Sequence, residues 1–230
     1  MAIKRLLLLA ALLGGCAAAP PPAPAPTAAP APDNAAAWYR QAAAAGGKVL
    51  VIDPAQSLVA VTVRRGGALA RLGHDHVVAS RAIAGYAAPA AGRADFSFRL
   101  DQMTVDEPAL RREAGLDTQP SADAVAGTRA NMLTRVLEAD KFPLVALHAQ
   151  QIADQPMQLT ITLHGVTRTV AAPTRIEPAG DGVAASGTLQ LRQSDFGITP
   201  MSVMGGAITV QDAIELRFRI VARTAGVEVR

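Results

Sequence analysis

Residues 158–170 read QLTITLHGVTRTV, and this stretch decides the fold class of the chain. Leu159, Ile161 and Leu163 alternate with polar residues, so one face of an extended segment is apolar and the other is polar. His164 and Gly165 follow, and a two-residue connection of this kind suits the turn of a β-hairpin. The stretch therefore predicts two antiparallel strands that turn one face toward the core of the protein.

The same two-residue period recurs on both sides of this hairpin. It covers residues 58–64, 76–88, 93–100, 144–152, 158–163, 166–176, 183–191 and 207–220, which predicts eight strands. Residues 107–140 interrupt the period, and the spacing of Met132, Leu133, Val136 and Leu137 within them is helical. We therefore expect an all-β antiparallel fold with a helical excursion between strands 3 and 4. Eight strands can close into a barrel, although a two-sheet sandwich would show the same alternation.

The N-terminus has the features of a targeting segment. Two basic residues precede an apolar run over residues 6–13, which is too short to span a bilayer but suits a signal-peptide core. The only cysteine of the chain, Cys16, follows two small residues, and this arrangement resembles the lipobox of bacterial lipoproteins. An ordinary secretory signal with an incidental cysteine is the alternative. We predict a periplasmic protein anchored through a lipid on Cys16, and Ala17 after it favours sorting to the outer membrane.

The segment between Cys16 and the strands is predicted to be a tether. Residues 17–32 contain seven Pro and eight Ala and no charge, so we expect an extended linker that reaches up to about 50 Å. An Ala-rich segment over residues 34–45 predicts a short helix, in which Trp38 and Tyr39 pack against the folded domain. The chain is therefore divided into a lipoprotein signal peptide over 1–15, a lipidated cysteine with linker and helix over 16–47, and a barrel domain over 48–230.

Composition excludes several classes of function. The formal net charge is +3 and no dense block of Lys and Arg exists, which argues against binding to nucleic acid. One cysteine cannot form an intramolecular disulfide or a thiolate cluster for metal. The sequence contains neither a phosphate-cradling glycine loop nor a Gly-x-Ser-x-Gly run, and we therefore predict that the protein is not an enzyme. The oligomeric state is not indicated.

Four stretches of the sequence resemble YceI-like domains. They are IDPAQS at 52–57, LEADKFP at 137–143, LTITLHGVTR at 159–168 and RQSDFGI at 192–198, and they follow the family's order within residues 49–222. The resemblance implies a lipocalin-like eight-stranded barrel in the periplasm. It also implies that the lumen binds a polyisoprenoid chain, such as the tail of a quinone or of an undecaprenyl-type carrier, and that no other cofactor is needed.

Under this interpretation the inward-facing apolar side chains hold the ligand. A packed core without a cavity is the alternative use of the same residues. The predicted ligand-binding residues are Val59, Val61, Val63, Phe96, Phe98, Leu100, Leu159, Ile161, Leu189, Leu191, Leu216, Phe218 and Ile220.

A cluster of histidines gives the second functional hypothesis. His74 and His76 flank Asp75, and the pair could bind zinc or copper with His148 or His164 as a third ligand. The protein would then be a metal-binding module or a metal-dependent periplasmic enzyme. Two other readings remain open: the histidines contact the head group of a lipid, or the loop is structural and Asp75 accepts backbone hydrogen bonds.

Overall fold

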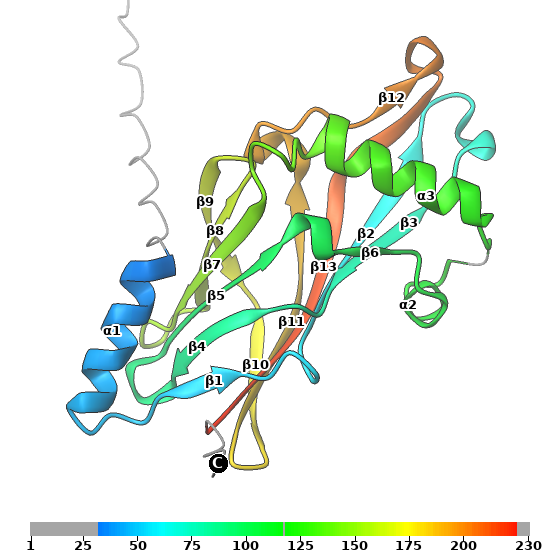
Figure 1. Cartoon of the computed structure of the whole chain (residues 1–230). Coiled ribbons are helices and arrows are strands. Elements are labelled where there is room, and N and C mark those ends of the chain that lie inside the picture. The colour runs from blue at the N-terminus through cyan, green and yellow to red at the C-terminus, as the bar shows by residue number, and fades with distance from the viewer. Residues whose placement is uncertain (1–31, 117, 225–230) are drawn as a thin grey trace, which may run out of the picture.

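The computed structural model describes residues 32–116 and 118–224 (Figure 1). The predicted signal peptide, Cys16 and nearly all of the predicted linker lie outside the described residues. Thirteen strands form one curled antiparallel sheet. In chain order they are β1 (Leu50–Ile52), β2 (Leu58–Gly66), β3 (His76–Ser80), β4 (Ala84–Ala88), β5 (Arg93–Arg99), β6 (Thr104–Val105), β7 (Leu144–Gln150), β8 (Met157–Leu163), β9 (Val166–Ala172), β10 (Thr174–Ala179), β11 (Gly182–Arg192), β12 (Ser202–Val203) and β13 (Ile208–Arg223).

The 16-residue strand β13 organises the sheet. One edge of β13 pairs with β2 and then with β1, and the other edge pairs with β11 and β12. From β1 the sheet continues through β4, β5, β7 and β8 to β9, whereas from β2 it continues through β3 to β6. The sheet therefore curls into a barrel-like wall with β13 as its spine (Figure 1).

The strands β9 and β10 are two halves of one extended segment that changes partner at Pro173. The first half pairs with β8 and the second half pairs with β11. Proline has no N–H group to give to either ladder, so it suits the point of change. Gly187 of β11 faces this point, and a Cβ atom there would overlap the carbonyl oxygen of Pro173. The segment thus joins the two sides of the curled sheet.

The structure confirms the predicted fold class and corrects the number of strands. Each of the eight predicted segments falls on strands, but the segment 76–88 divides into β3 and β4 and the segment 166–176 divides at Pro173. The short strands β1, β6 and β12 were not predicted, because two or three residues are too few to show a period. The helical excursion consequently lies between β6 and β7, not between the third and fourth strands.

The helices cover the outside and one end of the sheet. They are α1 (Pro32–Ala44), α2 (Pro108–Glu113), α3 (Ala122–Asn131) and the π-helical turn η4 (Met132–Val136), with 3₁₀ turns η1 (Ala70–Leu72), η2 (Pro89–Ala91), η3 (Leu100–Gln102), η5 (Gln193–Phe196) and η6 (Met204–Gly206). Leu110 of α2 packs on the outer face of β2 and β3. The pair α3 and η4 crosses one end of the barrel, which we call the upper end, and the β10–β11 hairpin marks the lower end (Figure 1). No helix within the described ranges is long and apolar enough to cross a membrane.

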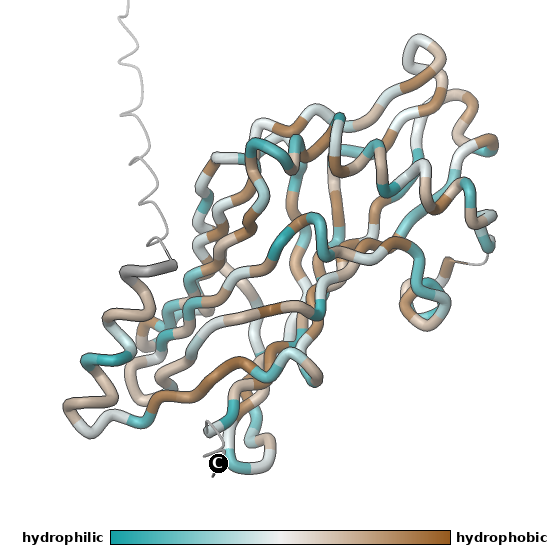
Figure 2. The backbone as a smooth tube through the Cα atoms, in the orientation of Figure 1, coloured by the Kyte–Doolittle hydropathy of each residue, from teal (hydrophilic) through white to brown (hydrophobic). Residues whose placement is uncertain are grey.

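Apolar and polar residues alternate along the strands, as Figure 2 shows. Val59, Leu147 and Leu216 are buried at 1%, 5% and 9% exposure and point into the barrel. Since they come from β2, β7 and β13, the core is assembled from distant parts of the chain. The inward faces thus form one continuous apolar interior.

Tyr39 fastens α1 to the outside of the barrel. Its hydroxyl donates to Asp95 Oδ2 at 2.8 Å, and Asp95 also accepts from Arg93 Nε at 2.7 Å. The other carboxylate oxygen of Asp95 lies 2.7 Å from His148 Nδ1. The Arg93 guanidinium stacks 4.3 Å from the centre of the Trp38 ring. Trp38 and Tyr39 therefore pack against the domain, as the sequence predicts, and burial beside Asp95 raises the pKa of the Tyr39 hydroxyl so that it stays a donor.

Candidate functional site

The interior of the barrel holds two apolar cavities. The upper chamber, of about 260 Å³, lies beneath α3 and η4, and the lower chamber, of about 210 Å³, lies toward the β10–β11 hairpin. Val59, Leu147 and Leu216 line both chambers, so the two cavities adjoin at these side chains. Taken together, their volumes fall within the range of roughly 300–1,000 Å³ that is usual for ligand pockets.

Most of the predicted ligand-binding residues line these chambers. Val61, Val63, Phe98, Leu100, Ile161 and Leu191 line the upper chamber. Phe96, Leu159, Phe218 and Ile220 line the lower chamber, and Val59 and Leu216 line both. Leu189 is the exception, because it is buried in the apolar core but does not line either chamber.

The helical excursion supplies lining residues that the sequence interpretation missed. Met132, Val136 and Leu137 close the upper chamber from above, and Met103 joins them from the segment before β6. The helical spacing of these residues was visible in the sequence. Their position over the lumen was not, because it depends on how the excursion folds back across the end of the barrel.

The upper chamber has a polar end. His76, Thr128, Asn131 and Gln193 line it there, among side chains that are otherwise apolar. The Nε2 atom of His76 lies 3.4 Å from Thr128 Oγ1, and its Nδ1 atom lies 2.6 Å from Asp106 Oδ2. A ligand at the top of the upper chamber would therefore meet hydrogen-bonding side chains.

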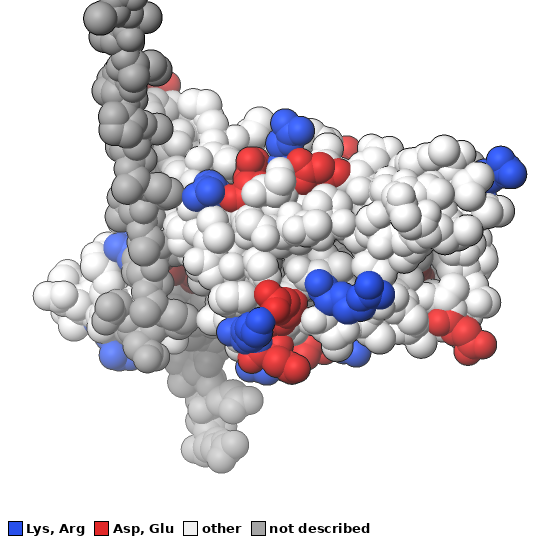
Figure 3. Space-filling model, turned by 90° about the horizontal axis from the view of Figure 1, so that it is seen from above, with Lys and Arg blue, Asp and Glu red and all other residues white. Residues whose placement is uncertain are grey.

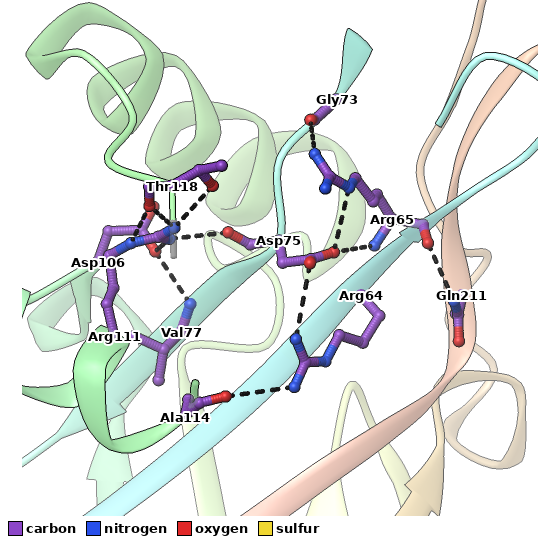
Figure 4. Close-up of polar contacts among 10 residues, drawn as sticks. All are labelled: Arg64, Arg65, Gly73, Asp75, Val77, Asp106, Arg111, Ala114, Thr118 and Gln211. Carbon is purple, nitrogen blue, oxygen red and sulfur yellow. Dashed lines mark hydrogen bonds and ion pairs between the residues drawn. The ribbon is translucent and has the colours of Figure 1, made fainter. Parts of the chain in front are cut away.

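The structure separates the two histidines that the sequence pairs. His76 lines the upper chamber, whereas His74 is exposed and lines neither chamber. Their ring centres lie 6.1 Å apart. Asp75, between them, accepts the backbone N–H of Arg65 at 2.8 Å, which is the structural role considered for this loop (Figure 4).

Behind His76 lies a buried ion pair (Figure 4). The side chains of Asp106 and Arg111 are 0% and 1% exposed, and Arg111 Nη1 donates to Asp106 Oδ1 at 2.6 Å. The backbone N–H of Val77 donates to the same oxygen at 3.0 Å. Burial on its own would raise the pKa of Asp106, but the hydrogen bonds from His76, Val77 and Arg111 outweigh it and hold the pKa below its usual value. Asp106 is therefore a carboxylate that anchors His76.

The other two histidines lie away from this pair. His148 bonds to Asp95 on the outside of the barrel, and His164 Nε2 lies 3.2 Å from Glu138 Oε2. In the part of the chain that the structure describes, no three His, Cys, Asp or Glu side chains are grouped so as to bind a metal ion. Among the described residues, neither His148 nor His164 is therefore grouped with His74 and His76 as the third ligand of that hypothesis.

Two of the recognisable stretches fix turns at the upper end. Phe142, from residues 137–143, meets the ring of His164 edge to face, with the ring centres 4.7 Å apart, in the turn between β8 and β9. The hydroxyl of Ser194, from residues 192–198, donates to Asp212 Oδ2 at 2.6 Å, and its backbone N–H donates to Asp212 Oδ1 at 2.8 Å. Ser194 is thus engaged in holding η5 against β13.

Charge on the surface is mixed. On the face shown in Figure 3, acidic and basic side chains gather in small groups that contain both signs. Ion pairs such as Arg192 with Asp212, at 3.1 Å, belong to this surface. The candidate site is therefore the apolar lumen, not a charged face.

The sequence and the fold are similar to those of known proteins. Residues 50–222 match the YceI-like domain. A polyisoprenoid binding domain from Saccharophagus degradans, implicated in plant cell wall breakdown, superposes with a TM-score of 0.54 at 9% identity, covering 77% of this chain and 99% of its own. BcnA from Burkholderia cenocepacia superposes with a TM-score of 0.49 at 14% identity, and the match covers 74% of this chain and 98% of BcnA. A YCEI protein from Campylobacter jejuni superposes with a TM-score of 0.40 at 15% identity, and the match covers 60% of this chain and 77% of that protein. No curated protein matches the sequence.

Proposed function

This chain belongs to the YceI-like domain family, and from that premise we propose that it carries an isoprenoid lipid with the tail held in the two chambers. The adjoining apolar chambers are the observation that carries the proposal. Each Å² of apolar surface that a tail removes from water contributes roughly 25 cal/mol, and a hydrocarbon chain needs no charged partner along its length. The solved domain from Saccharophagus degradans, described as polyisoprenoid binding, supports this class of ligand.

Native mass spectrometry of the protein purified from membranes tests the proposal. We expect an adduct of one isoprenoid lipid per chain, which is released on unfolding. A protein that retains only fatty-acyl lipids, or that has no affinity for an added isoprenoid, would contradict the proposal.

The polar end of the upper chamber favours a neutral head group such as a quinone ring. Thr128 can donate a hydrogen bond to a carbonyl oxygen there, and His76 Nε2 can accept one from the hydroxyl of the reduced ring, because His76 donates through Nδ1 to Asp106. A pyrophosphate would bring further negative charge close to the buried carboxylate of Asp106. Arg111 cannot offset that charge, because it already donates to Asp106, to the Asp75 carbonyl and to Thr118. The quinone is therefore the better match to the charges present.

The two histidines provide a matched pair of variants. We expect His76→Ala to weaken the binding of a reduced isoprenoid quinone by about 1–3 kcal/mol, because the ring hydroxyl is left without its acceptor. His74→Ala should bind the quinone like the wild type, because His74 does not line a chamber. Isothermal titration with the reduced quinone and with an unsubstituted isoprenoid hydrocarbon measures both effects. Equal losses for the two variants, or a loss for the hydrocarbon as well, would refute a head-group role for His76.

We further propose that the carrier works in the periplasm and is held there by a lipid on Cys16, most simply at the outer membrane. The apolar run before Cys16 and the small residues beside it support this anchor. Cys16→Ser should abolish both acylation and signal peptidase II processing, so that the precursor keeps its signal peptide. Intact-mass analysis of the wild type is decisive, since a mature chain without an acyl group would exclude the anchor.

A further inference from the structure

The wall of the lower chamber is open on one side. Met157 pairs with Ala172, and this is the last pair between β8 and β9 on the way to the lower end. Beyond it the chain continues as β10, and among the described strands β10 pairs with β11 alone. The other edge of β10 therefore faces the loop over residues 151–156, which connects β7 to β8, without a ladder between them.

Exposed apolar side chains stand at this opening. Ile176 of β10 lines the lower chamber and is nevertheless 54% exposed. Ile152, in the loop over residues 151–156, is 44% exposed and follows Gln151, which lines the same chamber. A side chain that both lines a cavity and meets solvent marks the place where the cavity opens. We call this opening, bounded by Ile152, Met157 and Ile176, the lateral mouth.

The opposite end of the barrel is crossed by α3 and η4 (Figure 1). Met132 and Val136 pack against the core and form the ceiling of the upper chamber. Leu72, Val203 and Met204 are exposed at the tip beside β12, at 58%, 38% and 66%, but they do not line either chamber. Exposed apolar residues are common on proteins, so it is the presence of Ile176 in the wall of the lower chamber that distinguishes the lateral mouth from this tip.

The border of the lower chamber beyond the lateral mouth has the chemistry of a lipid–water boundary. Arg93 lines the lower chamber, and its guanidinium lies between the Asp95 carboxylate and the ring of Trp38. Arginine and tryptophan combine an apolar body with a polar tip, which suits them to the level of lipid head groups. Since Trp38 lies on α1, the helix that follows the predicted tether is fixed at the lower end of the barrel (Figure 1).

We propose that the lateral mouth is the entrance through which an isoprenoid tail passes between a phospholipid surface and the lower chamber, with Ile152 and Ile176 in contact with that surface. This inference rests on the proposed function and adds the route of exchange. The two isoleucines keep the tail in apolar surroundings while it leaves the bilayer. Ile152 lines neither chamber and contributes to the rate of exchange, whereas Ile176 both lines the lower chamber and faces solvent.

A transfer assay with the full-length chain tests the entrance. Vesicles of phosphatidylethanolamine and phosphatidylglycerol carry a fluorescent polyprenol, and its movement to the protein and back is followed in time. We expect Ile152→Ser with Ile176→Ser to slow both the uptake and the release of the polyprenol about tenfold, because the tail passes the mouth in both directions. A mere loss of binding through Ile176, which also lines the lower chamber, would speed release instead. The matched control is Leu72→Ser with Met204→Ser, which replaces two exposed apolar residues at the other end of the barrel. We expect this variant to take up the polyprenol at the wild-type rate. All variants have the same N-terminus, so anchoring affects them equally.

A second measurement does not depend on how the serine variants fold. A bulky maleimide is attached to folded Ile176→Cys and, as its control, to folded Leu72→Cys. Labelling should block transfer at position 176 and leave it unchanged at position 72. Wild-type rates for both mouth variants, or slower transfer only in the tip controls, would overturn the entrance while the proposed function stands. A wild-type protein that takes up no polyprenol would instead refute the proposed function.

Discussion

Replacing Asp106 with alanine is expected to lower the free energy of unfolding by about 3–5 kcal/mol, because the change leaves the Arg111 guanidinium buried without its counter-charge. Both side chains are almost completely buried, and the bond between them is 2.6 Å long. The same substitution removes the acceptor for His76 Nδ1 and for the backbone N–H of Val77. Chemical denaturation monitored by circular dichroism measures the loss.

Two comparisons show whether the unpaired buried charge of Arg111 causes the loss of stability in Asp106→Ala. Asp106→Leu combined with Arg111→Met removes both charges, and we expect this pair to be more stable than Asp106→Ala alone. The second comparison uses pH. Because the folded state holds the pKa of Asp106 below its usual value, the carboxylate stabilises the fold above about pH 4, and this contribution is lost as the pH falls through the folded pKa. The unfolding free energy of Asp106→Ala should therefore fall less steeply in acid than that of the wild type. If the unfolding free energies of the variant and the wild type fell with the same slope in acid, Asp106 would not be a carboxylate that stabilises the fold.

Filling the lower chamber at Ala185 is expected to weaken the binding of a long isoprenoid tail by at least about 100-fold, since the tail loses the apolar surface that it would bury there. Ala185 lies on β11, lines the lower chamber, and stands in register with Ile176 on one side and Ile220 on the other. A phenylalanine ring at this position occupies space within a cavity of about 210 Å³. Because the ring enters existing space, the fold should lose little stability.

The control for this substitution lies one residue from the chamber wall. Ala171→Phe adds the same ring to the outer face of β9, next to Ala172, which lines the lower chamber. It should bind like the wild type. Ligands of increasing tail length separate the two chambers, because a short quinone that fits in the upper chamber should bind Ala185→Phe normally. If Ala185→Phe bound long and short tails as the wild type does, the lower chamber would not be part of the site.

The sequence predicts the inner wall of the barrel because the two-residue period is a local property. Val61 and Val63 could be assigned to the inner face from their neighbours alone, and both line the upper chamber. Strands of two or three residues, such as β6, have no period to detect, and the alternation of residues 166–176 continues on both sides of Pro173, where the strand changes its partner. The fold class was therefore predictable, whereas the strand count was not.

The polar parts of the site depend on contacts between distant residues. His74 and His76 look equivalent in the sequence, and only His76 meets Asp106, which lies 30 residues further along the chain. Asp106 reaches that place because β6 pairs with β3. In the same way Tyr39 finds Asp95 across 56 residues. Spacing along the chain does not encode such pairs, so the sequence alone left metal binding, head-group contact and a structural role open.

The change of partner at Pro173 has a mechanical consequence. In a fully paired barrel the diameter is fixed by the number of strands and by the stagger of their hydrogen-bond register. Here the ladders of β8 with β9 and of β10 with β11 are each complete on their own. A small rotation about Pro173 can therefore widen or narrow the barrel without breaking a hydrogen bond of either ladder. For the carrier proposed above, such a change in width would accommodate tails of unequal thickness, such as saturated and unsaturated chains.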